Sequence, residues 1–208
     1  STLLKVICGL LPYDGSLTLD GREIRDYHRD ELSRRIAMLS QFADAYFSYT
    51  VRETVMLGRY LHLKGFFGRP AADDNDAVDR CMEAVGISEL ADRRTDELSG
   101  GQRQRVFLAR TIAQETDIIA LDEPTNHLDI KYTAELSEYL MKWEGTLIGA
   151  FHDISYALGL GETVILMRDG RIEHIASTEE VLYHPEWLKT VYGYDVSSYL
   201  RQQSRMWE

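Results

Sequence analysis

The sequence predicts an α/β fold with a mostly parallel sheet, on three observations. Short apolar runs at 36–39, 118–121 and 146–151 have the length and composition of strands, and the run 118–121 suits a strand that is buried on both faces of a parallel sheet. Segments with helical spacing of their apolar residues lie between these runs, which is typical of α/β folds. Asp-Gly pairs at 20–21 and 169–170 separate short alternating segments and indicate two β-hairpins.

Length and composition allow one substantial core. The chain has 208 residues, 44% of them hydrophobic, which suits one catalytic domain with a smaller lobe attached. With 34 acidic against 23 basic residues the formal charge is -11, which would repel a nucleic-acid backbone, so we expect no nucleic-acid partner. Cys8 and Cys81 lack metal-ligand spacing and are expected to be buried free thiols. No apolar stretch approaches the ~18 residues that span a bilayer.

The first third of the chain alternates between helical and strand signals. Apolar residues at helical spacing follow Ser1 and Thr2 directly and continue until Pro12. The first hairpin is predicted at 16–24, and the apolar run that follows it ends at Ser40 and Gln41. A glutamine after a strand is ordinarily a polar loop residue.

Residues 46–96 are helical and amphipathic in pattern, with helices expected at 51–58, 76–85 and 87–91. Aromatic residues gather here, and periodicity leaves open whether they form a core or a groove for a partner helix. We expect a core for most of them and a docking surface at 46–59. The aromatic residues are Tyr46, Phe47, Tyr49, Tyr60, Phe66 and Phe67.

A helix at 102–114 is preceded by Ser99, Gly100 and Gly101. Ser99 is expected to cap this helix. The free N–H groups and the positive end of the helix dipole would then face an approaching anion, and the glycines would allow a phosphate to come close. The alternative is a plain cap before a buried helix.

Two strand ends carry polar side chains. Asp122 and Glu123 follow the run 118–121, and His152 follows the run 146–151. Ligands of parallel sheets gather at the carboxyl ends of strands, and adjacent carboxylates can take different roles there. The alternatives are a pair of solvated acids and a histidine that fills core or surface.

Together these motifs resemble the nucleotide-binding subunit of ATP-binding-cassette (ABC) transporters. Leu98-Ser99-Gly100-Gly101-Gln102 is similar to the signature of that family, and the run 118–121 into Asp122-Glu123 is similar to its Walker B strand. The resemblance covers essentially the whole chain. It implies one P-loop NTPase domain over 1–208, with a catalytic core at 1–45 and 99–208 and an inserted helical lobe at 46–98.

The resemblance also predicts a role for Ser1 and Thr2 in binding phosphate and Mg²⁺. In the family a loop of the form Gly-x-x-x-x-Gly-Lys-Ser-Thr opens the first helix, and here Ser1 and Thr2 would be its last two residues. We therefore expect the first strands, the adenine-stacking aromatic residue, the glycine-rich turn and the phosphate-binding lysine to be missing. Ser1 would be a Mg²⁺ ligand and Thr2 would lie near the α-phosphate. The alternative is a serine that merely starts a helix.

Family roles carry over to the strand ends and loops. Asp122 would hold Mg²⁺ through water, and Glu123 would polarise the water that attacks the γ-phosphate. Gln41 would be the Q-loop residue that reaches the Mg²⁺ and this water. His152 would be the switch histidine that contacts the γ-phosphate. Asp129 would belong to the D-loop at 126–129, which crosses a dimer interface.

The signature implies a second subunit, because in the family it touches the γ-phosphate of ATP that the opposite subunit holds. Ser99, Gly100, Gly101 and Gln102 would do so here, in a homodimer around two MgATP. Three stretches are similar to the ATPase subunits of importers for ferric siderophores, haem and cobalamin. They are the closing segment 177–207, Leu57-Gly58-Arg59-Tyr60 and Thr125-Asn126-His127-Leu128-Asp129. Membrane permease subunits, indirectly a substrate-binding protein, and a place at the cytoplasmic face of the membrane are then implied.

Two alternatives remain open. Soluble ABC proteins that act on ribosomes also carry Asn-His-Leu-Asp after the Walker B acids, although they have two cassettes and a charged linker. If Ser1 is the true start, the chain would be unable to hold the phosphates and could only bind partners or lie inert. The intact protein is expected to be an ATPase, whereas the polypeptide as given is expected to be inactive by itself.

Overall fold

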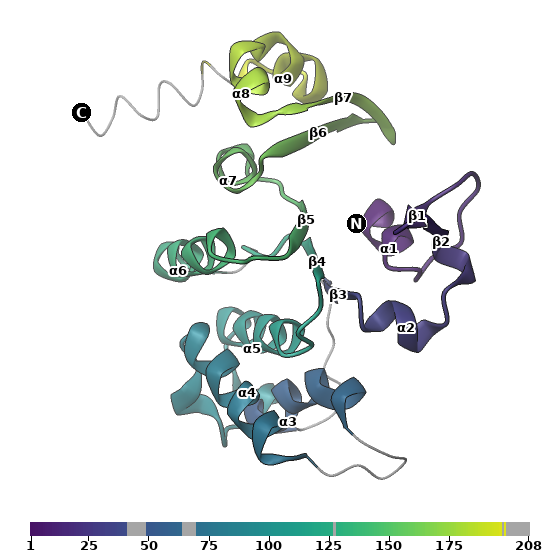
Figure 1. The fold of residues 1–208 in the computed structure, drawn as a ribbon. Helices are drawn as coiled ribbons and strands as arrows, with labels where there is room; N and C mark the ends of the chain where they lie inside the picture. Colours follow the sequence, from purple (N-terminus) through teal and green to yellow (C-terminus); the bar gives the residue numbers. More distant parts are fainter. Residues whose placement is uncertain (41–48, 64–69, 127, 197, 199–208) are drawn as a thin grey trace. The chain divides into compact units, whose positions relative to one another are not determined.

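The computed structural model describes residues 1–40, 49–63, 70–126, 128–196 and 198. Contacts within the chain divide it into two compact units, Ser1–Ala150 and Phe151–Glu208, and each is described by itself (Figure 1). The expected boundaries of an inserted lobe at 46–98 stay a prediction. Across the described ranges, no helix is both long and apolar enough to cross a membrane.

A parallel sheet forms the centre of the first unit. It consists of β3 (Ile36–Leu39), β4 (Ile118–Asp122) and β5 (Thr146–Ala150), in the order β3-β4-β5. In β4, Ile119, Ala120 and Leu121 are each at most 1% exposed, as expected of a central strand that is covered on both faces. The three apolar runs of the sequence are therefore confirmed as parallel strands.

One face of the sheet is covered by the first elements of the chain. The structure has α1 (Thr2–Ile7), the hairpin of β1 (Thr18–Leu19) and β2 (Arg22–Glu23), a 3₁₀ helix η1 (Ile24–Asp26) and α2 (Arg29–Ser33). The core between these elements and the sheet consists of Leu4, Ile24 and Leu32 together with Ile36 of β3 and Ala120 of β4.

The first helix is shorter than the apolar pattern predicted. Gly9, with φ of 66°, takes the left-handed conformation that ends helices, so the chain leaves the helix three residues before Pro12. Leu10 and Leu11 are consequently 55% and 38% exposed. Cys8 is half-buried rather than buried, whereas Cys81 is buried as expected.

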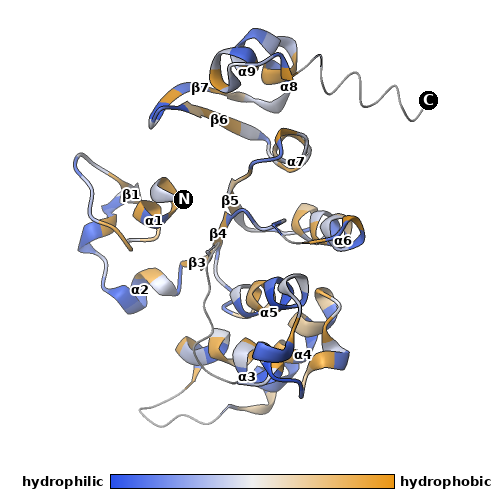
Figure 2. Cartoon of the chain, turned by 180° about the vertical axis from the view of Figure 1, so that it is seen from behind, coloured by the Kyte–Doolittle hydropathy of each residue, from blue (hydrophilic) through white to orange (hydrophobic). Residues whose placement is uncertain are grey.

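The middle segment is helical, and its longer helices pack on the signature helix α5. These elements are α3 (Val51–Met56), η2 (Leu57–His62), α4 (Ala72–Ala84), η3 (Ser88–Leu90), η4 (Thr95–Glu97) and α5 (Gly100–Ile112). Both α3 and α4 contact α5, and α5 contacts β3. Figure 1 shows α5 and α6 (Ile130–Met141) on the side of the sheet opposite α1, and Figure 2 shows hydrophobic and hydrophilic residues mixed along α4 and α5.

The expected aromatic core receives no support from its described members. Tyr49 is 41% and Tyr60 is 71% exposed, so neither belongs to a core. The other four members, Tyr46, Phe47, Phe66 and Phe67, lie outside the described residues.

The second unit is a hairpin covered by short helices. It contains α7 (Ile154–Leu160), β6 (Thr163–Arg168), β7 (Arg171–Ser177), α8 (Thr178–Tyr183) and α9 (Pro185–Tyr192). Asp169 and Gly170 have φ of 50° and 75°, the positive values that tight hairpin turns require, so the second Asp-Gly prediction is confirmed. Its core consists of Ile154, Val164, Leu166, Ala176, Val181 and Leu188.

Candidate functional site

Asp122 and Ser1 meet at the carboxyl end of β4. Asp122 is the last residue of the strand and is 2% exposed. Ser1 directly precedes α1, which packs on β4, and its hydroxyl donates a hydrogen bond to Asp122 Oδ1 over 2.9 Å. The fold thus brings together two of the expected magnesium ligands that are far apart in the sequence. Their roles as ligands stay predictions.

Glu123 follows in an unusual backbone conformation. Its φ of 52° lies in the left-handed region, which residues other than glycine rarely adopt. Its N–H donates to the carbonyl of Ala150 at the end of β5 over 2.9 Å, which holds the turn against the neighbouring strand. Such conformations gather at functional sites. The change of backbone conformation after Asp122 is compatible with separate roles for the two carboxylates.

Ser99 caps the signature helix, as predicted. Its hydroxyl accepts the N–H of Gln102 at 3.3 Å, and the side-chain oxygen of Gln102 accepts the N–H of Ser99 at 3.0 Å. This reciprocal pair is a capping box. Gly100 and Gly101 form the first turn, and Ser99 and Gly100 are exposed. The positive end of a helix of 13 residues is therefore accessible to an anion.

The signature helix lies beside the turn after β4. The amide of Gln104 donates to the carbonyl of Pro124 over 3.4 Å. On the far side of this turn, Asp129 caps α6 by accepting the N–H of Tyr132 at 3.0 Å. Asp129 is exposed, which is compatible with its predicted place at a dimer interface.

The other residues expected at the site are Thr2, His152 and Gln41. Thr2 is the first residue of α1 and is exposed. His152 is exposed and belongs to the second unit, where it precedes Asp153, the cap of α7. Gln41 lies outside the described residues, as does His127 of the expected D-loop. Their roles stay predictions.

Sequence reasoning gave no role of its own to Asn126. Its side-chain amide donates to Glu123 Oε2, and its backbone N–H donates to the carbonyl of Glu123 over 3.2 Å. An amide three residues after a carboxylate at a strand end was the available signal. It was obscured because asparagine is common in turns for local reasons.

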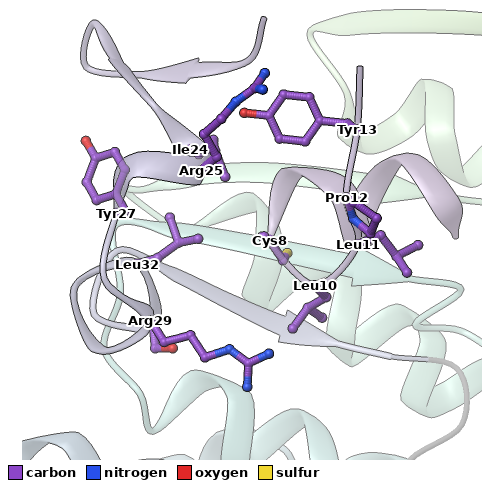
Figure 3. A pocket seen from close by; sticks show the side chains of 12 residues that line it. Cys8, Leu10, Leu11, Pro12, Tyr13, Ile24, Arg25, Tyr27, Arg29 and Leu32 are labelled. Carbon is purple, nitrogen blue, oxygen red and sulfur yellow. The ribbon is translucent and has the colours of Figure 1, made fainter. Parts of the chain in front are cut away.

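A cavity of about 600 Å³ lies apart from these residues (Figure 3). Its lining runs from the end of α1 through the segment after it to α2, and it includes Cys8, Tyr13, Arg25 and Arg29. Among the described residues, none that is expected to bind nucleotide or metal belongs to this lining. We therefore locate the candidate site at the strand end and not in this cavity.

The donor set at the strand end fits a magnesium ion. A carboxylate and a hydroxyl are hard oxygen ligands, and Mg²⁺ is typically bound through one or two carboxylates together with water and substrate phosphates. Asp122 and Ser1 supply such a pair with their oxygens 2.9 Å apart. With Glu123 directly after Asp122, the arrangement suits phosphoryl transfer.

Comparisons with known proteins agree with this chemistry. A family model described as ABC transporter matches residues 1–126. The ferric enterobactin transport ATP-binding protein FepC of Escherichia coli is 39% identical over 198 residues, which cover 93% of this chain and 72% of FepC. A cobalamin import ATP-binding protein, BtuD of Halobacterium salinarum, is 35% identical over 187 residues, which cover 88% of this chain and 46% of BtuD.

Two solved structures are similar in fold. One is an inward-facing conformation of a transporter assigned to the metal-chelate ABC type, with a TM-score of 0.76 and 26% identity over 92% of this chain and 73% of the other. The second is a dimeric ATP-binding cassette in a post-hydrolysis state with ADP and Pi, with a TM-score of 0.72 and 26% identity over 85% of this chain and 79% of the other. By its family match, its relatives and its fold, the chain belongs to the ABC transporter family.

Proposed function

We propose that the chain is the ATP-binding subunit of an ABC importer and hydrolyses ATP to drive uptake. The observation that carries this proposal is the contact between Ser1 Oγ and Asp122 Oδ1, with Glu123 directly after Asp122. The proposal is supported because these two oxygens could bind Mg²⁺ and the next residue in the chain, Glu123, carries a carboxylate that could act as a base. FepC and BtuD, which are described as ATP-binding proteins of import systems, support the same function.

Each residue of the site has a separate task in this proposal. Ser1 and Asp122 hold Mg²⁺, which would neutralise charge on the β- and γ-phosphates of ATP when bound. Glu123 accepts a proton from the attacking water. His152 donates a hydrogen bond to the γ-phosphate, and Gln41 orients the water. Thr2 binds near the α-phosphate.

A second copy of the chain completes each site. Ser99 and the N–H groups of the first turn of α5 face the γ-phosphate of ATP that the partner holds, and Asp129 helps to position the partner's site. The exposed, capped start of α5 supports this arrangement, because it offers a positive helix end that can receive the phosphate. The dimeric cassette with ADP and Pi supports a homodimer.

Membrane permease subunits and, indirectly, a substrate-binding protein are the proposed partners. The ATPase would act at the cytoplasmic face of the membrane through the permease. Iron–siderophore complexes and cobalamin are the proposed cargo, supported by the names of FepC and BtuD. Haem is included on the sequence resemblance. A ribosome-associated role is disfavoured by the net charge of -11.

ATP hydrolysis by the complete gene product tests the enzymatic part. We expect Glu123→Gln to bind MgATP as the parent does and to lose turnover by about 100-fold or more, since a positioned base contributes at least that much. Glu138→Gln, on the exposed side of α6, is the matched control and should keep the parent rate. Hydrolysis by Glu123→Gln at the parent rate would refute the base assignment, and an inactive parent would refute the enzymatic proposal.

Uptake by a strain that lacks the gene tests the cargo. Loss of labelled ferric siderophore or cobalamin uptake, restored by the parent gene and not by Glu123→Gln, is the expected result. Unchanged uptake of both compounds would contradict the proposed substrate class.

A further inference from the structure

The turn after β4 holds the backbone of Glu123 on both sides. The Glu123 N–H donates to the carbonyl of Ala150 over 2.9 Å, and the Glu123 carbonyl accepts the N–H of Asn126 over 3.2 Å. Gln104 of α5 contacts the carbonyl of Pro124 within the same turn over 3.4 Å. The positive φ of Glu123 is therefore maintained by contacts to a strand, a helix and the turn itself. What these backbone contacts leave variable is the direction of the Glu123 carboxylate.

The side chain of Asn126 acts on that carboxylate. Its amide nitrogen donates to Glu123 Oε2, and both residues are half-buried. A hydrogen bond to one carboxylate oxygen restrains the group and narrows the range of directions in which the other oxygen can point. A neutral amide can do this without bringing a positive charge to the base, which would make it a weaker proton acceptor.

We propose that Asn126 is a positioning residue that orients the carboxylate of Glu123 toward the attacking water. The inference rests on the proposed ATPase function and adds to it a residue that acts through Glu123. It assigns a task to the first residue of the expected D-loop within its own subunit, separate from the contact across the dimer that is expected of Asp129.

Steady-state kinetics of the complete gene product test the orientation. We expect Asn126→Ala to lower kcat by about 10- to 100-fold, because small misplacements of reacting groups can cost up to about 100-fold, and to leave KM for MgATP within about twofold. Asn126→Ser keeps a donor and should recover part of the loss. Asn126→Asp keeps the shape, cannot donate when ionised and repels Glu123, so its kcat should fall below that of Asn126→Ala. If Asn126 only filled space in the turn, Asn126→Asp, which keeps the shape of the side chain, would have a higher kcat than Asn126→Ala.

A matched control and a double-mutant cycle separate orientation from folding. Asn75→Ala removes an amide that donates to the Ala71 carbonyl over 3.0 Å on α4, and it should leave kcat unchanged. In the Glu123→Gln protein the base is absent, so adding Asn126→Ala should not lower the residual single-turnover rate further.

Three results would overturn the inference: an equal fold-loss from Asn126→Ala in the parent and in Glu123→Gln, a kcat for Asn126→Asp at or above that of Asn126→Ala, or parent kinetics in Asn126→Ala. These results differ from failure of the proposed function, in which the parent itself hydrolyses no ATP or Glu123→Gln hydrolyses it at the parent rate.

Discussion

Replacing Arg59 tests how the middle helices are joined to the signature helix. The Arg59 side chain is 7% exposed and lies in η2. Its Nε pairs with Asp74 Oδ1 of α4 at 3.1 Å, and its Nη1 donates to the Ala113 carbonyl at the end of α5 at 2.9 Å. The same Nη1 lies 2.6 Å from Glu115 Oε2. One guanidinium thus connects η2 with α4 and with the C-terminal end of α5.

The structure indicates a large cost for Arg59→Ala. Truncation leaves the carboxylate of Asp74, whose side chain is 10% exposed, without its cation and leaves the Ala113 carbonyl without this donor. Breaking a buried ion pair by removing one partner costs about 3–5 kcal/mol. The contact with Glu115 adds little, because that side chain is 49% exposed. We therefore expect the free energy of unfolding to fall by about 3–5 kcal/mol.

Urea unfolding followed by circular dichroism provides the measurement, with Arg52→Ala as the matched control. Arg52 forms an ion pair with Asp79 at 2.5 Å, and these side chains are 38% and 54% exposed. Loss of an exposed pair costs at most about 1 kcal/mol. Arg59→Lys keeps the charge without the planar fork and should fall between the two. If Arg59→Ala destabilised the protein no more than Arg52→Ala does, the buried-pair reasoning would be refuted.

Three further predictions concern packing, acid stability and thiol chemistry. A Cβ at Gly58 would lie 2.2 Å from the carbonyl oxygen of Arg110, so Gly58→Ala should lower the free energy of unfolding in urea by about 1–3 kcal/mol, and a change within about 0.5 kcal/mol would contradict this. Hydrogen bonding, first of all from Ser16, lowers the pKa of Glu23 from 4.5 to about 2. Because the pKa of Glu23 is lower in the folded than in the unfolded protein, its ionised carboxylate stabilises the fold fully above about pH 4.5, and this stabilisation is lost as the pH falls toward 2. Between these pH values the free energy of unfolding of Glu23→Gln should therefore fall less than that of the parent. An equal fall would contradict the assignment. Burial raises the pKa of Cys81 to about 11, so iodoacetamide at about pH 8 should label this residue only after unfolding. Rapid labelling of Cys81 in the native protein, located by peptide mass spectrometry to distinguish it from Cys8, would exclude a buried thiol.

Features with local causes could be predicted from the sequence. The cap at Ser99 depends on a residue three positions away, and each Asp-Gly turn depends on two adjacent residues, with φ of 51° and 77° at Asp20 and Gly21. The buried strand β4 could be predicted because a strand that is covered on both faces needs an uninterrupted apolar run. The end of α1 was misjudged, because its apolar pattern continues past Gly9, where the backbone has already left the helix.

Features that depend on contacts distant in the sequence could not be derived from the residues alone. Ser1 and Asp122 are 121 positions apart, and only the family resemblance associated them with one site. Arg59 and the Ala113 carbonyl are 54 positions apart, and no periodic pattern marks a buried arginine. The hydrogen bond from Asn126 to Glu123 spans only three positions and was still missed, because asparagine is common in turns for local reasons.

The most direct test of the account is whether Ser99 of one copy completes the site of another. The complete gene product carrying Glu123→Gln should form a dimer when MgATP is added, measured by analytical ultracentrifugation, and return to monomer when the nucleotide is removed. Adding Ser99→Arg, which places a long charged side chain at the start of α5, should leave MgATP binding nearly unchanged and abolish the ATP-dependent dimer. Equal dimerisation of both proteins with MgATP would contradict the composite site.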